Sequence, residues 1–271
     1  MIIRLLKLIY RKINKHYFID NNYLQRWKNF PFRILKNLIW ELIEFSFYIY
    51  NYFFSYHCIN CKIEILYHNG LCNKCWIKLD ILDSDICGRC GKKNKLYCCQ
   101  NNDLYKQKKI EIIFRHGLKM NQFTKQLIHN FKYYDNFTTG EILTNLILKY
   151  IPDNKYDYLI PIPMFYLKKI IRIYNPTLEI AKTINKNKQI ELLTDLLYKN
   201  KFTPSQTSLS QIQRKRNIKN SFKIYNGNRI KNKNIILIDD IYTTGATFKE
   251  NIRQLLIYKP KKILCISLAY N

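Results

Sequence analysis

The sequence predicts an α/β protein whose sheet is mostly parallel, preceded by a cysteine-rich module. Strand-like and helix-like segments alternate from about residue 110 to residue 271, which is typical of a parallel sheet. Upstream of them, eight of the nine cysteines lie between Cys58 and Cys99. Hydrophobic residues make up 47% of the 271, so the chain can bury a substantial core and wholesale disorder is excluded.

The expected elements of the α/β part follow in order along the chain. Strands are predicted at residues 110–115, 156–162, 235–238 and 263–270, and helices at 122–131, 139–150, 176–185 and 248–258. Residues 235–238 are all isoleucine or leucine, as expected of a strand buried on both faces. Pro161 and Pro163 end the second strand in a loop. The polar region between Ile184 and Asn217 is expected to be loop-like.

Three segments are predicted on this basis. Residues 1–56 form a basic, aromatic helical extension, residues 57–103 hold the cysteine cluster, and residues 110–271 form the α/β domain. The apolar stretch at residues 34–56 contains Glu41 and Glu44, and two carboxylates make membrane spanning costly. We therefore expect an amphipathic or buried helix there. The alternatives are a helix lying on an anionic membrane surface and a helix covering an apolar face of the main domain.

The sequence favours a cytoplasmic protein. No run of 18 uncharged apolar residues is present, so no membrane span is predicted. The first apolar run is interrupted by Lys7 and is followed by no small-residue cleavage site, which argues against a signal peptide. Paired cysteines without a secretory signal are typical of zinc ligands in a reducing compartment rather than of disulfides.

The chain is strongly basic. It has 46 Lys and Arg against 19 Asp and Glu, a formal net charge of +27. Such a charge favours polyanionic partners such as nucleic acid, phosphates or acidic lipid. The alternative is compositional drift, because the 35 Lys, 29 Asn and 22 Tyr are all residues with AT-rich codons.

Three C-x-x-C pairs and one adjacent pair make up the cysteine cluster. Zinc prefers four soft ligands in a tetrahedron, and two residues between thiolates let one tight turn supply two corners. Two zinc sites are predicted, with structural roles, because protein thiolates fill every position. The first comprises Cys58, Cys61, Cys72 and Cys75, and the second Cys87, Cys90, Cys98 and Cys99.

Alternatives remain for parts of this cluster. The adjacent pair Cys98 and Cys99 strains the second site, where a water or His116 can replace one ligand. Gly88 and Gly91 are expected to supply the permissive backbone of that turn. Redox-active thiols are the alternative to zinc. Cys265 lies in a predicted core strand and is expected to be a small buried hydrophobe.

Residues 235–247, IILIDDIYTTGAT, are the most informative stretch. An apolar strand leads to Asp239 and Asp240, then to a short loop of threonines and a glycine, then to a helix. Unpaired N–H groups at a helix N-terminus favour an anion, so the loop can bind a phosphate. The carboxylates can accept hydrogen bonds from the vicinal hydroxyls of a sugar and can hold Mg²⁺. A phosphate site beside a diol site describes a ribose 5-phosphate.

This stretch resembles the phosphoribosyl-pyrophosphate (PRPP) signature of type I phosphoribosyltransferases at every position. Together with the cysteine pairs, it resembles the ComF/GntX family, in which a double zinc ribbon precedes a phosphoribosyltransferase-like domain. The resemblance implies a mostly parallel sheet of phosphoribosyltransferase type and covers about residues 57–271. Further segments agree with it: Phe131–Tyr133, Tyr158–Met164, Arg172–Pro176, and Thr203, Gln206, Leu209, Arg214, Arg216, Asn217 and Phe222. Ile173 and Pro176 depart from the family's Gly and Gln.

The resemblance also implies roles for individual residues. Asp239 and Asp240 would bind the ribose and Mg²⁺, and Arg172 would bind the pyrophosphate, with Lys132, Arg214 and Arg216 as outer cations. The 5-phosphate would be held by Thr243, Thr244, Gly245, Ala246 and Thr247. Phosphoribosyl transfer needs no protein nucleophile, because catalysis rests on positioning and on neutralising the leaving pyrophosphate.

Three functions are compatible with the sequence. The first is a ComF-like competence protein that handles incoming single-stranded DNA in natural transformation, with DNA-uptake proteins and a membrane surface as further possible contacts. Tyr97, Tyr133 and Tyr134 are its candidate base-stacking residues. The second is a phosphoribosyltransferase with an unknown acceptor. The third is a PRPP-sensing zinc-ribbon adaptor that mainly binds protein. No base-reading pocket is recognisable, so the sequence does not decide whether PRPP is turned over.

Overall fold

The computed structural model describes residue 41 and residues 56–65, 70–83, 86–93, 99, 110–133, 137–165, 175–200 and 218–271. The chain divides into two units, Met1–Tyr56 and His57–Asn271. Of the first unit only Glu41 and Tyr56 are described, so the expected helix over residues 34–56 and its alternatives lie outside the described residues. Among the described residues, no helix is both long and apolar enough to cross a membrane.

The described elements are short in the cysteine module and longer in the α/β part. The module contains β1 (Tyr56–His57), β2 (Glu64–Ile65), α4 (Asn73–Trp76) and β3 (Asp80–Ile81). The α/β part contains β4 (Glu111–Lys119), α5 (Gln122–Tyr133), α6 (Phe137–Leu148), β5 (Tyr158–Pro161), α8 (Pro176–Lys188), β6 (Glu191–Leu192), β7 (Leu197–Lys199), β8 (Phe222–Ile224), the 3-10 helix η3 (Gly227–Ile230), β9 (Asn234–Tyr242), α10 (Ala246–Leu256) and β10 (Lys262–Tyr270).

Six strands form the main sheet in the order β3-β4-β10-β9-β5-β6. β10 pairs in parallel with β4 on one side and with β9 on the other, and β5 extends the parallel pairing from β9 to β6. The edge strand β3 runs antiparallel to β4. The predicted α/β fold with a mostly parallel sheet is therefore confirmed.

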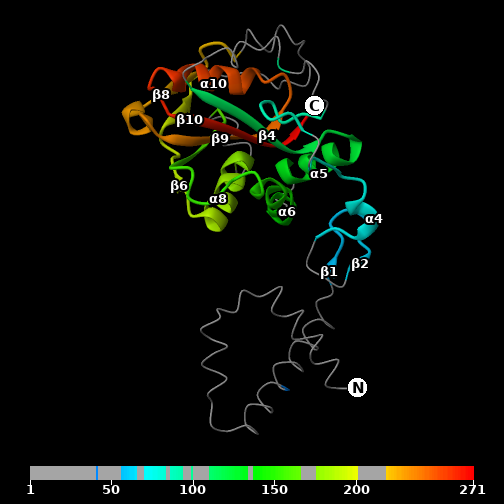
Figure 1. Ribbon diagram of the computed structural model, residues 1–271. Coiled ribbons are helices and arrows are strands. Elements are labelled where there is room, and N and C mark those ends of the chain that lie inside the picture. The colour runs from blue at the N-terminus through cyan, green and yellow to red at the C-terminus, as the bar shows by residue number, and fades with distance from the viewer. Residues whose placement is uncertain are drawn as a thin grey trace, which may run out of the picture. The chain divides into compact units, whose positions relative to one another are not determined.

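Helices cover both faces of this sheet (Figure 1), and a hydrophobic core forms on each face. The residues of β9 alternate between the two cores. Ile236 and Ile238 pack with α5, α6 and α8, whereas Ile235 and Leu237 pack with α10. All four side chains are fully buried, as the uninterrupted apolar run predicts. The central strand β9 therefore leads directly to the residues proposed for binding.

The structure corrects the predicted end of this strand. The acids were expected to follow the strand, but β9 continues beyond them to Tyr242. Ile241 and Tyr242 stay in register with Ala269 and Tyr270 of β10, so the ladder holds the backbone on both sides of the acids. Asp239 and Asp240 therefore lie on a paired strand, which fixes their position more firmly than a loop would.

The region expected to be loop-like between Ile184 and Asn217 also contains strands. β6 lies at the edge of the main sheet, and β7 pairs with β8 in a separate two-stranded sheet. Leu197 and Phe222 anchor that small sheet, because both are buried in the core that contains α10. Strands of two or three residues are too short for a hydrophobic period to reveal them, so the prediction of a loop was wrong for these elements.

The cysteine module is joined directly to the main sheet. Ile81 of β3 pairs with Leu118 of β4, and the Leu82 N–H donates to the Gly117 carbonyl at 3.0 Å. Side chains of the module's first half are buried in the same core as α5 and α6: Cys58, Leu71, Cys75 and Leu79. The module is thus attached by both backbone pairing and apolar packing.

Candidate metal centres and phosphate site

Four cysteines of the module's first half come together in one cluster. The sulfur atoms of Cys58, Cys61, Cys72 and Cys75 all lie within 4.8 Å of one another, and those of Cys61 and Cys72 are 3.5 Å apart. Four thiolates bound to zinc at about 2.3 Å lie roughly 3.8 Å apart in a tetrahedron. The cluster therefore has the donor type and the dimensions that a structural zinc site requires.

A second cluster contains Cys87, Cys90 and Cys99, whose sulfur atoms also lie within 4.8 Å of one another. The sulfur atoms of Cys87 and Cys99 are 3.5 Å apart. Cys98, the other predicted ligand of this site, lies outside the described residues. The three described sulfurs can supply three corners of a zinc tetrahedron, and Cys98 remains the predicted fourth ligand.

The first knuckle is closed by two backbone hydrogen bonds around Cys58. The Lys62 N–H donates to the Cys58 carbonyl at 2.9 Å, and the Cys58 N–H donates to the Ile63 carbonyl at 2.8 Å. Lys62 has a φ of 60°, in the left-handed region, so it turns the chain sharply after Cys61. This tight turn brings both cysteines of the pair to the same side.

The second knuckle repeats this backbone pattern. The Gly91 N–H donates to the Cys87 carbonyl at 2.9 Å, and the Cys87 N–H donates to the Lys92 carbonyl at 2.9 Å. Gly91 has a φ of 68° and takes the place of Lys62, as its expected permissive role requires. Gly88 has open space around a built Cβ and no positive φ, so the expectation for this glycine was wrong. Two turns of the same design support the same ligand chemistry at both clusters.

The first knuckle also favours a thiolate at Cys58. Burial alone would raise the pKa of this thiol, but hydrogen bonds from the backbone of Cys61, Cys72 and Asn60 outweigh it and lower the pKa to about 6. Because zinc binds the thiolate and not the thiol, backbone donors aimed at the sulfur prepare it for metal.

His116 is not a ligand of the second cluster. Its ring is fully buried, with Nε2 3.1 Å from the Cys90 carbonyl oxygen and Nδ1 2.7 Å from the Ser267 hydroxyl. Both ring nitrogens are therefore already engaged, and burial lowers the pKa of His116 to about 3. The alternative in which His116 replaces a cysteine was wrong, and the residue instead ties the knuckle to β10. Cys265 is fully buried in β10, which confirms its predicted core position.

The predicted phosphate loop forms the turn between β9 and α10. Gly245, the N-cap of α10, has a φ of 71°, so it turns the chain into the helix from the left-handed region. Gly245 has no side chain to cap the helix, the Thr244 hydroxyl accepts one long hydrogen bond from the Ala246 N–H at 3.4 Å, and the first turn contains no acidic residue. The positive end of the helix dipole is therefore available to an anion. All five predicted phosphate-binding residues are half-buried: Thr243, Thr244, Gly245, Ala246 and Thr247.

The two acids lie half-buried a few residues upstream of this turn. The Asp240 N–H donates to Oδ1 of Asp239 at 2.9 Å, which links the pair. Oδ2 of Asp240 lies 2.5 Å from Nζ of Lys132, which projects from the last turn of α5. Both partners of this ion pair keep only about a fifth of their side-chain surface exposed, at 18% and 19%. Lys132 therefore belongs to the site and is not a solvated surface charge.

Removal from water raises the pKa of Asp239 to about 7, and the negative charge of Asp240 acts in the same direction. The positive charges of Lys132 and Lys199 oppose this rise. Asp239 can therefore be partly protonated near neutral pH until a cation or a hydrogen-bond donor arrives. Strongly shifted carboxyl groups of this kind are typical of binding and catalytic sites.

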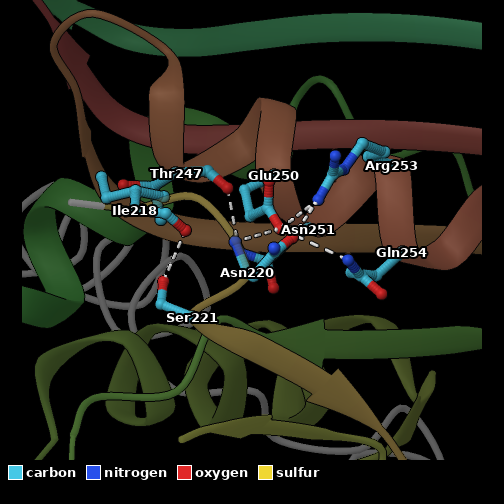
Figure 2. A network of polar contacts seen from close by, with 8 residues as sticks. All are labelled: Ile218, Asn220, Ser221, Thr247, Glu250, Asn251, Arg253 and Gln254. Atoms are coloured by element: carbon cyan, nitrogen blue, oxygen red, sulfur yellow. Dashed lines mark hydrogen bonds and ion pairs between the residues drawn. The ribbon is translucent and has the colours of Figure 1, made fainter. Parts of the chain in front are cut away.

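A polar network fixes α10 against the turn before β8 (Figure 2). Oε1 of the buried Glu250 accepts hydrogen bonds from the Asn220 N–H at 3.0 Å, from Arg253 at 3.0 Å and from Gln254 at 3.3 Å. Arg253 also donates to Oδ1 of Asn220 at 2.6 Å. Because Glu250 lies one turn after the phosphate loop, the network holds the beginning of α10 in place.

Several predicted site residues lie outside the described residues. These are Arg172, Arg214 and Arg216, and, among the candidate stacking residues, Tyr97 and Tyr134. Description resumes at Asn175, whose side chain accepts a hydrogen bond from the Thr177 N–H and caps α8. Pro176 occupies the start of that helix, a position that proline favours, so its departure from the family's Gln is compatible with the helix.

The sequence assigned Lys132 only an outer role and missed Lys199 and Tyr242 altogether. Lys132 was named only because the segment Phe131–Tyr133 resembles a family segment, and its direct contact with Asp240 became visible once the fold placed α5 beside β9. Tyr242 lies inside the recognised motif, yet its neighbours come from β4 and the cysteine module. The family resemblance supplied the signal for Lys132, whereas nothing in the sequence singled out Lys199.

We predict close to two zinc ions per chain, because the first cluster brings four thiols together and the second brings three, with Cys98 as the predicted fourth ligand. Metal analysis of the purified full chain should give about two zinc ions for the natural sequence and about one for Cys75→Ser. Cys265→Ser, which removes a buried thiol outside both clusters, should keep about two. A natural chain with zinc near zero would contradict the assignment.

The raised pKa of Asp239 predicts a pH-dependent stability difference. The folded chain binds a proton here more tightly than the unfolded chain, so stability is lost as pH rises from about 4 to about 7. In the zinc-loaded protein without ligand, Asp239→Asn should raise the thermal midpoint at about pH 8, with an advantage that shrinks toward about pH 5. Asp153→Asn, at an exposed carboxylate, is the control. An advantage of equal size at every pH would contradict the prediction.

Comparisons with known proteins agree with this two-part organisation. Residues 49–104 match the double zinc ribbon domain, and residues 179–271 match the phosphoribosyl transferase domain. A curated relative, competence protein F of Haemophilus influenzae, is 27% identical over 210 residues, which cover 73% of this chain and 90% of that protein.

Solved structures were also compared. Glutamine phosphoribosylpyrophosphate amidotransferase from B. subtilis is 14% identical with a TM-score of 0.36, covering 56% of this chain and 34% of that one. A hypoxanthine-guanine phosphoribosyltransferase from Bacillus anthracis is 16% identical with a TM-score of 0.30, covering 52% and 67%. The chain thus spans about a third of the length of the amidotransferase. From the domain matches, the chain carries a double zinc ribbon followed by a phosphoribosyl transferase domain, in the order that the sequence predicted.

Proposed function

We propose that this protein is a ComF-like competence protein that binds PRPP, or a related ribose 5-phosphate, and handles incoming single-stranded DNA during natural transformation. One observation carries the ligand assignment: a carboxylate pair and a glycine–threonine turn at a helix N-terminus lie at the same edge of the sheet, along the run from β9 to α10. The relative named competence protein F supports the biological role. Clustered thiols support a reducing, cytoplasmic location.

The turn suits the 5-phosphate of the ligand. The first N–H groups of a helix have no partner within the helix; here the Ala246 N–H donates to the Thr244 hydroxyl at 3.4 Å, a long contact that an arriving phosphate could replace, and the hydroxyls of Thr243, Thr244 and Thr247 are further donors. A side chain at position 245 would have to lie within 2.4 Å of the Tyr242 hydroxyl, so glycine leaves this turn compact and open to an anion. The phosphate would thus be held by the backbone and by neutral hydroxyls.

The acids suit the ribose hydroxyls and the Mg²⁺ that accompanies PRPP. Both can accept hydrogen bonds from vicinal hydroxyls, and carboxylate oxygens are the ligands that Mg²⁺ prefers. In the ligand-free chain Lys132 neutralises Asp240 and a proton partly neutralises Asp239. An arriving cation would favour the charged form of both acids, and Lys132 could then turn toward the pyrophosphate.

The site fits binding with or without turnover. Transfer of the ribosyl group breaks the C1–pyrophosphate bond through a cationic sugar, and positioning together with charge neutralisation supplies the catalysis. The alternative of a phosphoribosyltransferase therefore uses the same residues and adds an acceptor. Release of pyrophosphate with a base or an amide acceptor distinguishes it from a binding protein.

Single-stranded DNA is the proposed macromolecular partner. The net charge of +27 suits a polyanion, and Tyr133, whose ring centroid lies 4.6 Å from that of His129, keeps 53% of its surface exposed at the end of α5. Exposed aromatic rings among cations are typical of surfaces that bind single strands, because bases stack on the rings while cations contact phosphates. Tyr133 therefore remains the described candidate for base stacking.

We predict that Asp239→Asn combined with Asp240→Asn lowers the affinity for PRPP with Mg²⁺ by more than about a hundredfold. Two charge-assisted hydrogen bonds to the ribose are weakened and the metal loses its charged ligands. Titration calorimetry measures the affinity, and pyrophosphate release is followed in parallel. Asp83→Asn with Asp153→Asn, at two exposed carboxylates, is the matched control. Unchanged affinity in the site variant would count against the ribose assignment.

We predict that binding of a labelled single-stranded oligonucleotide weakens steeply with salt. Fluorescence anisotropy should give a log–log slope near −0.7 for each phosphate contacted, or about −3 to −4 for five contacts. Tyr133→Ala should weaken binding by about fivefold or more, whereas Tyr225→Ala, at another exposed tyrosine, serves as the control. A flat salt response would indicate that the positive charge is compositional drift.

A further inference from the structure

We infer that the second cysteine knuckle supports the phosphate-binding turn through Tyr242, so that metal at this knuckle and ligand at the turn are coupled. This inference rests on the proposed function and adds a mode of regulation to the same site. The structural path has three parts: the knuckle at residues 86–93, the ring of Tyr242, and Gly245 at the start of α10.

The knuckle lies in direct contact with β4 and β10 of the main sheet. The Phe114 N–H donates to the Arg89 carbonyl at 2.7 Å, and the Lys93 N–H donates to the Tyr270 hydroxyl at 3.2 Å. A Cβ built on Gly91 would lie 2.5 Å from the Phe114 carbonyl oxygen, so no larger residue fits between the two backbones. The position of the knuckle relative to β4 and β10 is therefore fixed.

From the knuckle, Lys92 reaches Tyr242. Nζ of Lys92 lies 4.9 Å from the centroid of the Tyr242 ring and 5.4 Å from that of Tyr270. These are cation–π distances. His116, which contacts the carbonyl oxygen of Cys90, also places its ring centroid 5.0 Å from that of Tyr242. Two side chains held by the knuckle thus contact the same tyrosine.

Tyr242 in turn defines the shape of the turn. A Cβ built on Gly245 would lie 2.4 Å from the Tyr242 hydroxyl oxygen and 2.7 Å from Cζ, so the tyrosine packs directly against this residue. The Tyr242 ring also stacks on Phe248 of α10, with centroids 6.0 Å apart. A shift of the Tyr242 ring would therefore displace both Gly245 and the first turn of the helix.

The first cysteine cluster packs on a different part of the fold from the second, so it provides an internal control. Cys58 and Cys75 of the first cluster are buried in the core formed with α5 and α6. Gly70, beside that cluster, packs against Ile142 of α6. The first cluster therefore attaches the module to the opposite helical layer, and its loss should leave the turn at residues 243–248 unchanged.

The test compares Cys87→Ser with Cys61→Ser in the zinc-loaded full chain without ligand, by hydrogen exchange of the amides of residues 243–248. Each variant removes one ligand of one cluster. We expect exchange to become about tenfold faster or more in Cys87→Ser and to change less than about twofold in Cys61→Ser, because only the former frees the knuckle beneath Tyr242. Equal exchange in the two variants would overturn the inference.

A milder pair of variants applies if Cys87→Ser fails to fold. Lys92→Met removes the cation and keeps the aliphatic stem, and it should weaken PRPP binding by about three- to tenfold. Lys92→Arg, which preserves the cation–π contact, should restore binding to within about twofold. Equal PRPP affinity in Lys92→Met and the natural chain would overturn the inference.

The reciprocal measurement completes the design. By thermodynamic linkage, PRPP with Mg²⁺ should raise the affinity for one of the two zinc ions, measured by equilibrium competition with a chelator, and leave the affinity for the other unchanged. If the natural chain binds no PRPP, the proposed function fails while the exchange comparison still decides the coupling. If it binds PRPP and the affinity for neither zinc ion rises, the coupling fails while the proposed function stands.

Discussion

The pairing of β9 with β10 is the constraint on which the candidate site depends. The two strands run in parallel register from Asn234 opposite Lys262 to Tyr242 opposite Tyr270, and α10 connects them. Because the apolar half of β9 is fully buried on both faces, the strand cannot slide without exposing its core residues. Its carboxyl end and the start of α10 are thereby held within a few residues, which places carboxylates beside a helix N-terminus.

The carboxylate pair at this edge of the sheet contrasts with the positive net charge of the chain. A chain with a net charge of +27 places two of its 19 acidic residues side by side, half-buried and linked by a hydrogen bond. Such a pair is costly, as the raised pKa of Asp239 records, and the ion pair between Lys132 and Asp240 offsets only part of it. Carboxyl groups with strongly raised pKa values are typical of binding sites, where a ligand supplies the missing hydrogen bonds or positive charge. This supports the proposed ribose and Mg²⁺ site.

The sequence predicted those parts of the structure that are determined by residues adjacent in the chain. The apolar run at residues 235–238, the acids and the threonine–glycine turn follow one another, so strand, helix and loop could all be predicted there. The C-x-x-C pairs could likewise be predicted as metal ligands, because two residues between the cysteines allow one tight turn to place both sulfurs at the same site. Lys92 could not be predicted as a neighbour of the site, because its position depends on the knuckle meeting β9 from a distant part of the chain. Lys132 could be named only from the family resemblance, and only as an outer cation. β6, β7 and β8 were missed because so few residues cannot display a period.

The two knuckles have the same backbone turn but different surroundings. Lys62 and Gly91 occupy equivalent positions with positive φ, yet only Gly91 lies against the backbone of β4, where a side chain would collide with the Phe114 carbonyl. Lysine is tolerated in the first knuckle because that turn faces solvent, and Lys62 is exposed there. Glycine at position 91 therefore does more than permit a turn. It lets the second knuckle approach closely enough for Lys92 to reach Tyr242, and this close approach is what separates a knuckle that shapes the site from one that only attaches the module.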